Sequence, residues 1–309
     1  MSYLELVKAE YKLVYGELLR RKSAFISLIM YPYLFTGFTL FLGYAIGSPQ
    51  SFSEKIGVDP LIYLITASYL MFSILVAIGD ILWRPLNDLW VGTLPYIIAS
   101  PVNRVKLYFA IPLPRLTGVI IMGSTSIAPV YLWFYGLSGL IVSFIVIGLS
   151  ILGGLLMITF AITTAGLIHS MSESWRVLNI VRPILMILLG IYYPRFLMPL
   201  SGYILSSIIP SSHVVEAVQR ILMGGYNNLH VLLVIAIVLA LLYTPLGKNS
   251  FFIGRKRRRK KVLKQVRRAY AVLKAYALAE LVRSKGLVYG LIGFSILDDL
   301  VPITNVVIR

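Results

Sequence analysis

Long apolar runs separated by short polar segments dominate the chain. The runs cover residues 25–46, 61–79, 107–135, 140–168, 177–193 and 229–246. Each is close in length to the ~20 residues that an α-helix needs to cross a bilayer. Arg182 and Pro183 interrupt the fifth run and leave it a short apolar core. The pattern predicts an all-α integral membrane protein with six transmembrane helices.

Composition and charge support this prediction. The hydrophobic share is 58%, whereas soluble domains have roughly 45–50%. With a cytoplasmic N-terminus and six alternating spans, 25 Lys and Arg residues face the cytoplasm and three face the other side. This asymmetry follows the positive-inside rule, so both termini are expected to be cytoplasmic. The net charge of +17 then indicates contact with anionic membrane lipid rather than with nucleic acid.

The residues ahead of the first run follow a different pattern. Apolar side chains recur there every three or four positions, at Leu4, Val7, Tyr11, Val14 and Leu18. This spacing places them on one face of a helix. It predicts an N-terminal interfacial amphipathic helix along the inner membrane surface. Packing of the same helix against a cytosolic subunit is the open alternative.

The segment Gly92–Arg104, between the second and third runs, is short and partly polar. Asp80, Arg84 and Asp88 precede it, and Lys106 follows it. In the predicted topology it lies on the cytoplasmic side, where we expect it to bind a partner in the water phase.

After the fifth run the chain predicts an excursion on the outer side. The apolar stretch 203–209 is too short to cross a membrane, and Pro210 separates it from a polar-faced helix. The pattern favours an outer re-entrant segment between spans 5 and 6, whose backbone must be buried by protein or line a cavity. A plain outer loop with surface helices is the alternative. Glu216 and Arg220, four residues apart, are expected to form a local helix pair rather than a proton relay.

These segments, in this order, resemble an ABC-2 type permease, the membrane-spanning subunit of an ATP-binding-cassette exporter. The family's first inner loop carries Gly-Thr-Leu, apolar residues, Ser-Pro and a basic residue. This chain matches that loop at Gly92, Thr93, Leu94, Ile97, Ile98, Ser100, Pro101 and Arg104. The inner loop with Ser172 and Glu173 also fits, and Pro194, Pro199, Pro210, Glu216 and Arg220 resemble the family's outer segment. Pro95 departs from the pattern, because the family more often has a charged residue there.

The resemblance implies that Gly92–Arg104 is a coupling helix for a separate ABC ATPase subunit. ATP and Mg would be bound by that partner. This chain has no phosphate loop, and we expect it to bind no cofactor and to be no enzyme. No metal site is predicted either, because cysteine is absent and the three histidines are scattered.

The permease would work as a dimer with a second copy, identical or different, in the plasma membrane of a prokaryote. It would export an apolar or amphipathic substrate, such as a drug, lipid or glycoconjugate, which the sequence does not specify. The alternative is an ATP-independent membrane protein, either a secondary carrier or an integral membrane scaffold.

The sequence divides into a transmembrane domain, residues 1–250, and a basic cytoplasmic tail, residues 251–309. Within the tail, Glu280–Ile292 aligns with Glu17–Ile29. We interpret the tail as the truncated start of a second permease unit. A functional tail, or a chance likeness between two basic amphipathic helices, is the alternative.

Overall fold

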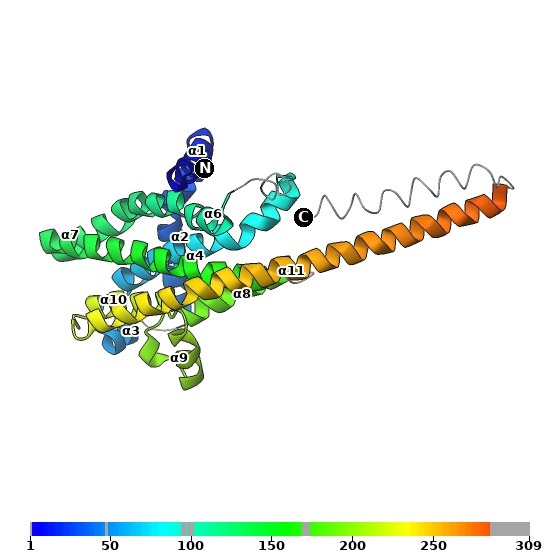
Figure 1. Ribbon diagram of the computed structural model, residues 1–309. Coiled ribbons are helices and arrows are strands. Elements are labelled where there is room, and N and C mark those ends of the chain that lie inside the picture. The colour runs from blue at the N-terminus through cyan, green and yellow to red at the C-terminus, as the bar shows by residue number, and fades with distance from the viewer. Residues whose placement is uncertain (1, 47–48, 94–96, 98–101, 169–173, 285–309) are drawn as a thin grey trace. The chain divides into compact units, whose positions relative to one another are not determined.

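The computed structural model describes residues 2–46, 49–93, 97, 102–168 and 174–284. These residues form helices and no strand, which confirms the all-α class (Figure 1). The helices are α1 (Tyr3–Arg20), α2 (Lys22–Ile46), α3 (Pro49–Ile56), α4 (Pro60–Val91), α6 (Arg104–Ala110), α7 (Leu113–Ile168), α8 (Ser174–Leu188), the 3-10 helix η1 (Arg195–Leu197), α9 (Leu200–Ser207), α10 (Pro210–Leu222) and α11 (Leu229–Ser284).

The chain divides into two compact units, Met1–Gly254 and Arg255–Arg309. The described part of the second unit is the C-terminal part of α11, where Val272, Leu273 and Tyr276 are exposed. The last eight residues of the segment that aligns with Glu17–Ile29 lie outside the described residues. The interpretation of the tail as a truncated repeat therefore stays a prediction.

Among the described residues, three helical stretches are long and apolar enough to cross a membrane. They are Pro60–Asp88, Val105–Ile168 and Leu229–Ser250. Their length and composition suit a membrane protein, as the sequence predicts. The second stretch contains both the third and the fourth apolar run. The first and fifth runs lie in or near α2 and α8, outside these three stretches, so the six-span count stays a prediction.

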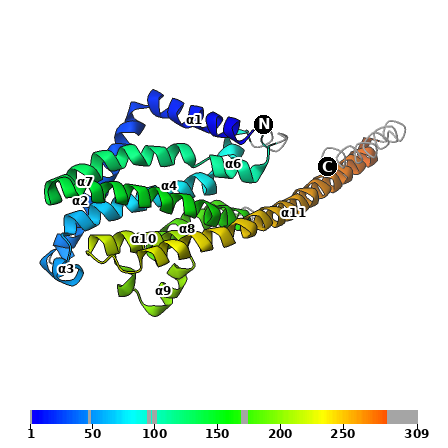
Figure 2. The ribbon, with the colours of Figure 1, turned by 60° about the vertical axis from the view of Figure 1, so that its left-hand side comes forward.

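Helix α7 is folded back on itself. A straight helix of its 56 residues would be about 84 Å long, nearly three times the ~30 Å of a bilayer core. Gly136 breaks it with φ 62° and ψ −148°, values that glycine adopts without a Cβ clash. On either side, Gly123 approaches Ile147 and Gly154 approaches Leu116. Both pairs are centred on residue 135, so the two arms run antiparallel (Figure 2).

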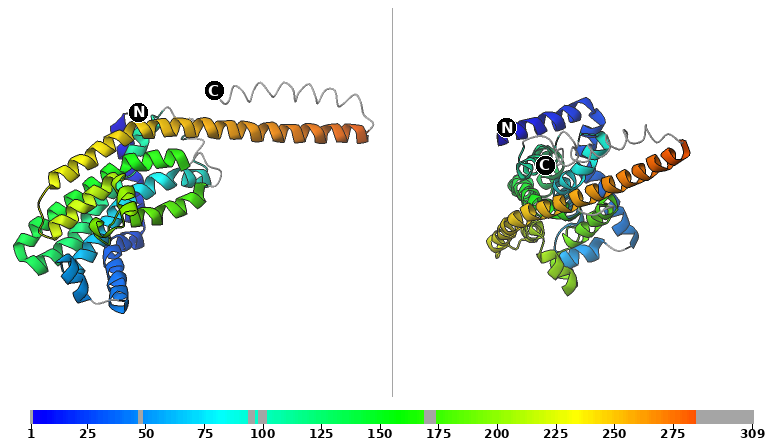
Figure 3. Two further views of the ribbon diagram at one scale, coloured as in Figure 1. Left: turned by 90° about the horizontal axis from the view of Figure 1, so that it is seen from below. Right: turned by 45° about the vertical axis from the view of Figure 1, so that its right-hand side comes forward.

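Helix α4 forms the centre of the first unit. It packs against both arms of α7 and also against α2, α8 and α10. The most apolar part of α4 is 78% buried, whereas the most apolar part of Leu229–Ser250 is only 17% buried. Helix α1 lies against α6, α7 and α2 (Figure 3).

Candidate functional site

The connecting segment between α4 and α6 is held at both of its ends. Gly92, with φ +79°, ends α4, and the Thr93 hydroxyl donates to the Asp88 carbonyl at 3.3 Å and to its carboxylate at 3.2 Å. The Ile97 N–H donates to the Thr93 carbonyl at 3.2 Å. At the other end, the Asn103 side chain caps α6 by accepting from two backbone N–H groups. The polypeptide thus leaves α4 and enters α6 through defined caps.

Several residues predicted to bind an ATPase cannot be placed. Residues outside the described part of the chain include Leu94, Ile98, Ser100, Pro101, Ser172 and Glu173. Arg104 is the first residue of α6. The structure therefore places the two ends of the predicted coupling segment and Ile97, but not Leu94 or Ile98.

A chain of charged contacts joins α1 to the end of α4. Arg84 donates to both carboxylate oxygens of Glu10, at 3.1 and 3.2 Å, and its Nε donates to Asp88 at 3.3 Å. Bidentate guanidinium–carboxylate pairs fix orientation as well as distance. Glu10 is only 6% exposed. Because Asp88 also accepts from Thr93, contacts run without a break from the connecting segment to α1.

The inward face of α1 differs from the predicted apolar stripe. Val7, Tyr11, Val14 and Leu18 of that stripe are half-buried, and Leu4 is 70% exposed. The buried positions are Leu6 and Glu10. The buried face of α1 thus includes Glu10, whose carboxylate reaches Arg84.

A second ion pair joins α4 to α7. The Arg115 guanidinium lies 3.1 Å from one carboxylate oxygen of Asp80. The Arg115 side chain is half-exposed. The other carboxylate oxygen of Asp80 is buried and has no hydrogen-bond partner in the described part of the chain.

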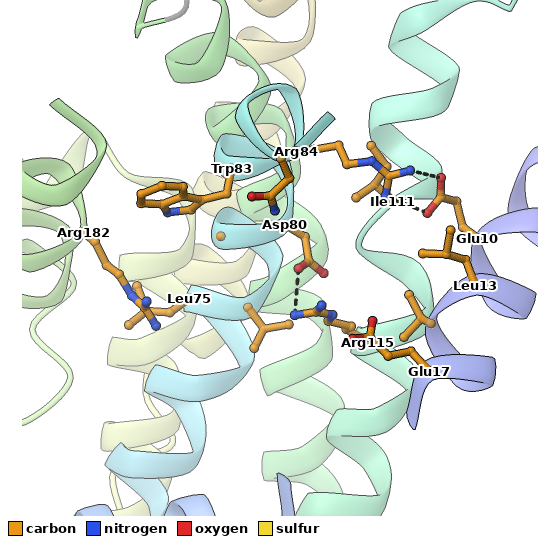
Figure 4. Close-up of a pocket in the computed structure, with 14 residues that line it drawn as sticks. Glu10, Leu13, Glu17, Leu75, Asp80, Trp83, Arg84, Ile111, Arg115 and Arg182 are labelled. Atoms are coloured by element: carbon orange, nitrogen blue, oxygen red, sulfur yellow. Dashed lines mark hydrogen bonds and ion pairs between the residues drawn. The ribbon is translucent and has the colours of Figure 1, made fainter. Parts of the chain in front are cut away.

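These ion pairs line a cavity of about 310 Å³ (Figure 4). Helices α1, α4, α7 and α8 contribute to it, together with Ile111 before α7. Its charged residues are Glu10, Glu17, Asp80, Arg84, Arg115 and Arg182, and its aromatic residue is Trp83. In Figure 4, Arg182 and Trp83 lie on one side of α4, and Arg115 and Glu10 lie on the other.

A separate buried cluster lies in the segment after α8. The Arg195 side chain is 1% exposed, donates to Glu216 at 2.7 Å and to Ser207 at 2.7 Å, and stacks over Tyr203. Glu216 also pairs with Arg220 at 2.6 Å, so the expected local pair is present. The sequence pattern did not single out Arg195. Its position between two helix-initiating prolines was the available signal.

The prolines of this segment lie at helix starts. Pro194 and Pro199 precede η1 and α9, and Pro210 is the first residue of α10. Helix α10 then packs into the core, where the Ser211 hydroxyl donates to the Gly153 carbonyl of α7 at 2.7 Å. Protein therefore buries α10, and the outer re-entrant segment stays a prediction.

His213 makes the stability of this cluster sensitive to pH. Burial lowers the pKa of His213 below its ordinary value of 6.5, and neighbouring Arg195 lowers it further, against the opposing effects of the Ser207 carbonyl and Glu216. The folded state thus keeps the imidazole neutral where the unfolded chain already binds a proton. Stability from this residue is present above pH 6.5 and is lost as pH falls below it, by at most about 1.4 kcal/mol per pH unit.

We therefore expect the unfolding temperature of the full chain to decrease when the pH is lowered from 7 to 5. In His213→Gln this decrease should be smaller. Scanning fluorimetry in detergent measures both. His230→Gln is the matched control, because His230 is exposed and its replacement should leave the slope unchanged. Equal slopes for wild type and His213→Gln would contradict the prediction.

No protein-family model, curated protein or solved structure matched the chain. The described residues also contain no group of three or more His, Cys, Asp or Glu side chains that could hold a metal ion. The contacts above and the sequence resemblance are therefore the grounds for assigning a function.

Proposed function

We propose that this protein is the permease subunit of an ATP-driven ABC exporter, with ATP hydrolysed by a separate subunit. The observation that carries the proposal is the unbroken path from the connecting segment through Thr93, Asp88 and Arg84 to Glu10. Such a path would carry a displacement of the connecting segment to α1 if a partner bound there.

The path has a direct mechanical consequence. When an ATPase opens or closes around residues 92–104, the end of α4 moves, and the Arg84–Glu10 pair moves α1 with it. The Arg115–Asp80 pair passes the displacement to the first arm of α7. Alternating access is then a shift in population between inward- and outward-facing states, which the ATPase binds differently.

The remaining features of the proposal concern the membrane. The six apolar runs would form six spans. Helix α1 would lie along the inner membrane surface, and residues 194–222 would form the outer re-entrant segment. Exposed apolar side chains on α2 and α11, such as Phe41 and Leu241, would face lipid or a second permease copy. Anionic lipid would neutralise the basic residues on the inner side.

The proposal is tested by purifying the tagged full-length chain from its own host membrane. We expect an ATPase subunit to remain bound and the complex to hydrolyse ATP. A secondary carrier or a scaffold would yield no hydrolysis above background. Transport that depends on an ion gradient and is indifferent to ATP would favour the carrier.

A further inference from the structure

The contacts of His213 in the Arg195 cluster determine its tautomer. The Nε2 atom of the imidazole lies 3.0 Å from the Ser207 carbonyl. A carbonyl can only accept, so Nε2 carries the proton. The Nδ1 atom lies 3.2 Å from Nη1 of Arg195 and accepts from the guanidinium. The second contact requires the neutral imidazole, because a charged imidazole has a proton on each nitrogen.

A second proton on His213 would turn this contact into a repulsion. The Nδ1–H group would face a guanidinium, which has no acceptor to offer, and two cationic groups would meet at hydrogen-bond distance. The cluster already has an excess of positive charge, since Arg195 and Arg220 share the one carboxylate of Glu216. Water could screen the added charge little, because the Arg195 side chain is 1% exposed.

The charged groups that act on the imidazole come from η1 and from α10 itself. Burial has the largest effect and lowers the pKa of His213, Arg195 lowers it further, and Glu216 opposes both. Helices α4 and α7 also pack against α10, where they offer the Tyr63 hydroxyl and the Gly153 carbonyl to other polar side chains of that helix. Uptake of a proton therefore favours an arrangement in which the imidazole and the guanidinium are apart.

Helices η1 and α9 depend on this cluster for their attachment to α10. The Arg195 guanidinium comes from η1, stacks over the Tyr203 ring of α9, donates to the Ser207 hydroxyl and pairs with Glu216 of α10. The apolar side chains around it contribute little packing. Those that are more than half exposed are Phe196, Leu197, Leu200, Ile204 and Leu205. Movement of Arg195 away from α10 would thus release η1 and α9 together.

We infer that His213 is a pH-sensitive latch on this segment: when the imidazole takes up a proton, Arg195 separates from it and η1 and α9 detach from α10. The segment is closed at neutral pH and released in acid. In the predicted topology it lies on the outer side of the membrane, so the latch would respond to the external pH. The latch needs no ATPase, and its failure and the failure of the exporter proposal are therefore independent.

A spin label on α9 tests the latch. The sequence contains no cysteine, so Ile204→Cys provides a single labelling site at an exposed position. Electron paramagnetic resonance of the full chain in detergent then measures the closed and released fractions. We expect the ratio of closed to released segment to fall about tenfold between pH 7 and pH 5, since one proton can change it by at most about tenfold per pH unit. Equal spectra at the two pH values would overturn the inference.

Two variants of the labelled chain test the roles of the latch residues. In His213→Gln the amide can donate to the Ser207 carbonyl but cannot take up a proton, so the segment should stay closed at both pH values. Arg195→Gln removes the guanidinium and should leave the segment released at both. A pH response that persists in His213→Gln, or an Arg195→Gln chain that stays closed at pH 7, would overturn the latch.

A label at a distant site distinguishes local release from general unfolding. Leu137→Cys places the nitroxide at the reversal of α7, where the native side chain is 79% exposed. We expect its spectrum to be the same at pH 7 and pH 5. If both labels become mobile together, acid loosens the whole fold and the latch is overturned.

Discussion

Replacing Leu94 and Ile98 together by aspartate is expected to abolish association with the ATPase and ATP-driven transport, while the chain still inserts into the membrane. Both residues belong to the Gly92–Arg104 segment that resembles the coupling helix. Burial of one such side chain is worth roughly 1.5–3 kcal/mol. Loss of two would therefore weaken docking about a hundredfold or more. Recovery of the ATPase with the tagged chain, and transport into vesicles, measure the two effects.

A matched double variant controls for added negative charge. Val272→Asp with Leu273→Asp makes the same kind of change at exposed apolar positions of α11, on a part of the chain predicted to be cytoplasmic. We expect this variant to keep the ATPase. Normal ATPase recovery and transport in the Leu94 and Ile98 variant would mean that this segment is not the coupling element.

The helical class could be predicted because it follows from local sequence. Apolar length alone predicts helices that can cross a membrane. Residues 136–139 separate the third and fourth apolar runs, and the chain reverses direction inside that interval, at Gly136. Small residues without a preferred backbone conformation are a local signal for such a reversal.

The ion pairs of the site could not be predicted, because they join residues distant in sequence. Glu10 and Arg84 are 74 positions apart. Periodicity reports which face of α1 is apolar, but it does not report which distant charge meets that face. The available signal was the position of Glu10, three residues after Val7 and four before Val14, at the edge of the apolar face.

Arg195 was missed for a related reason. It is one of three basic residues on the predicted outer side, where the charge asymmetry treats it as a solvated residue. Its burial depends on Ser207, Tyr203 and Glu216, which the folding of α9 and α10 brings around it. Charge counts treat every basic residue as solvated, and a buried, paired guanidinium is the exception.

The α7 hairpin gives the second large expected effect, from Gly139→Ala. Gly139 lies just after the reversal, and a Cβ there would come well within 3.0 Å of the Tyr131 backbone carbonyl on the other arm. Backbone cannot move aside as a side chain can, so the two arms would have to separate. We expect destabilisation of about 3 kcal/mol or more and loss of the single sharp peak in fluorescence-detected size exclusion.

Gly148→Ala is the matched control for this prediction. Gly148 lies on the same arm of α7, and an added Cβ there meets nothing within 4 Å. In a helix interior, alanine is favoured over glycine by roughly 0.8–1.0 kcal/mol, so this variant should unfold at the same or a higher temperature. If Gly139→Ala behaves like Gly148→Ala, the arms are not packed closely at the reversal.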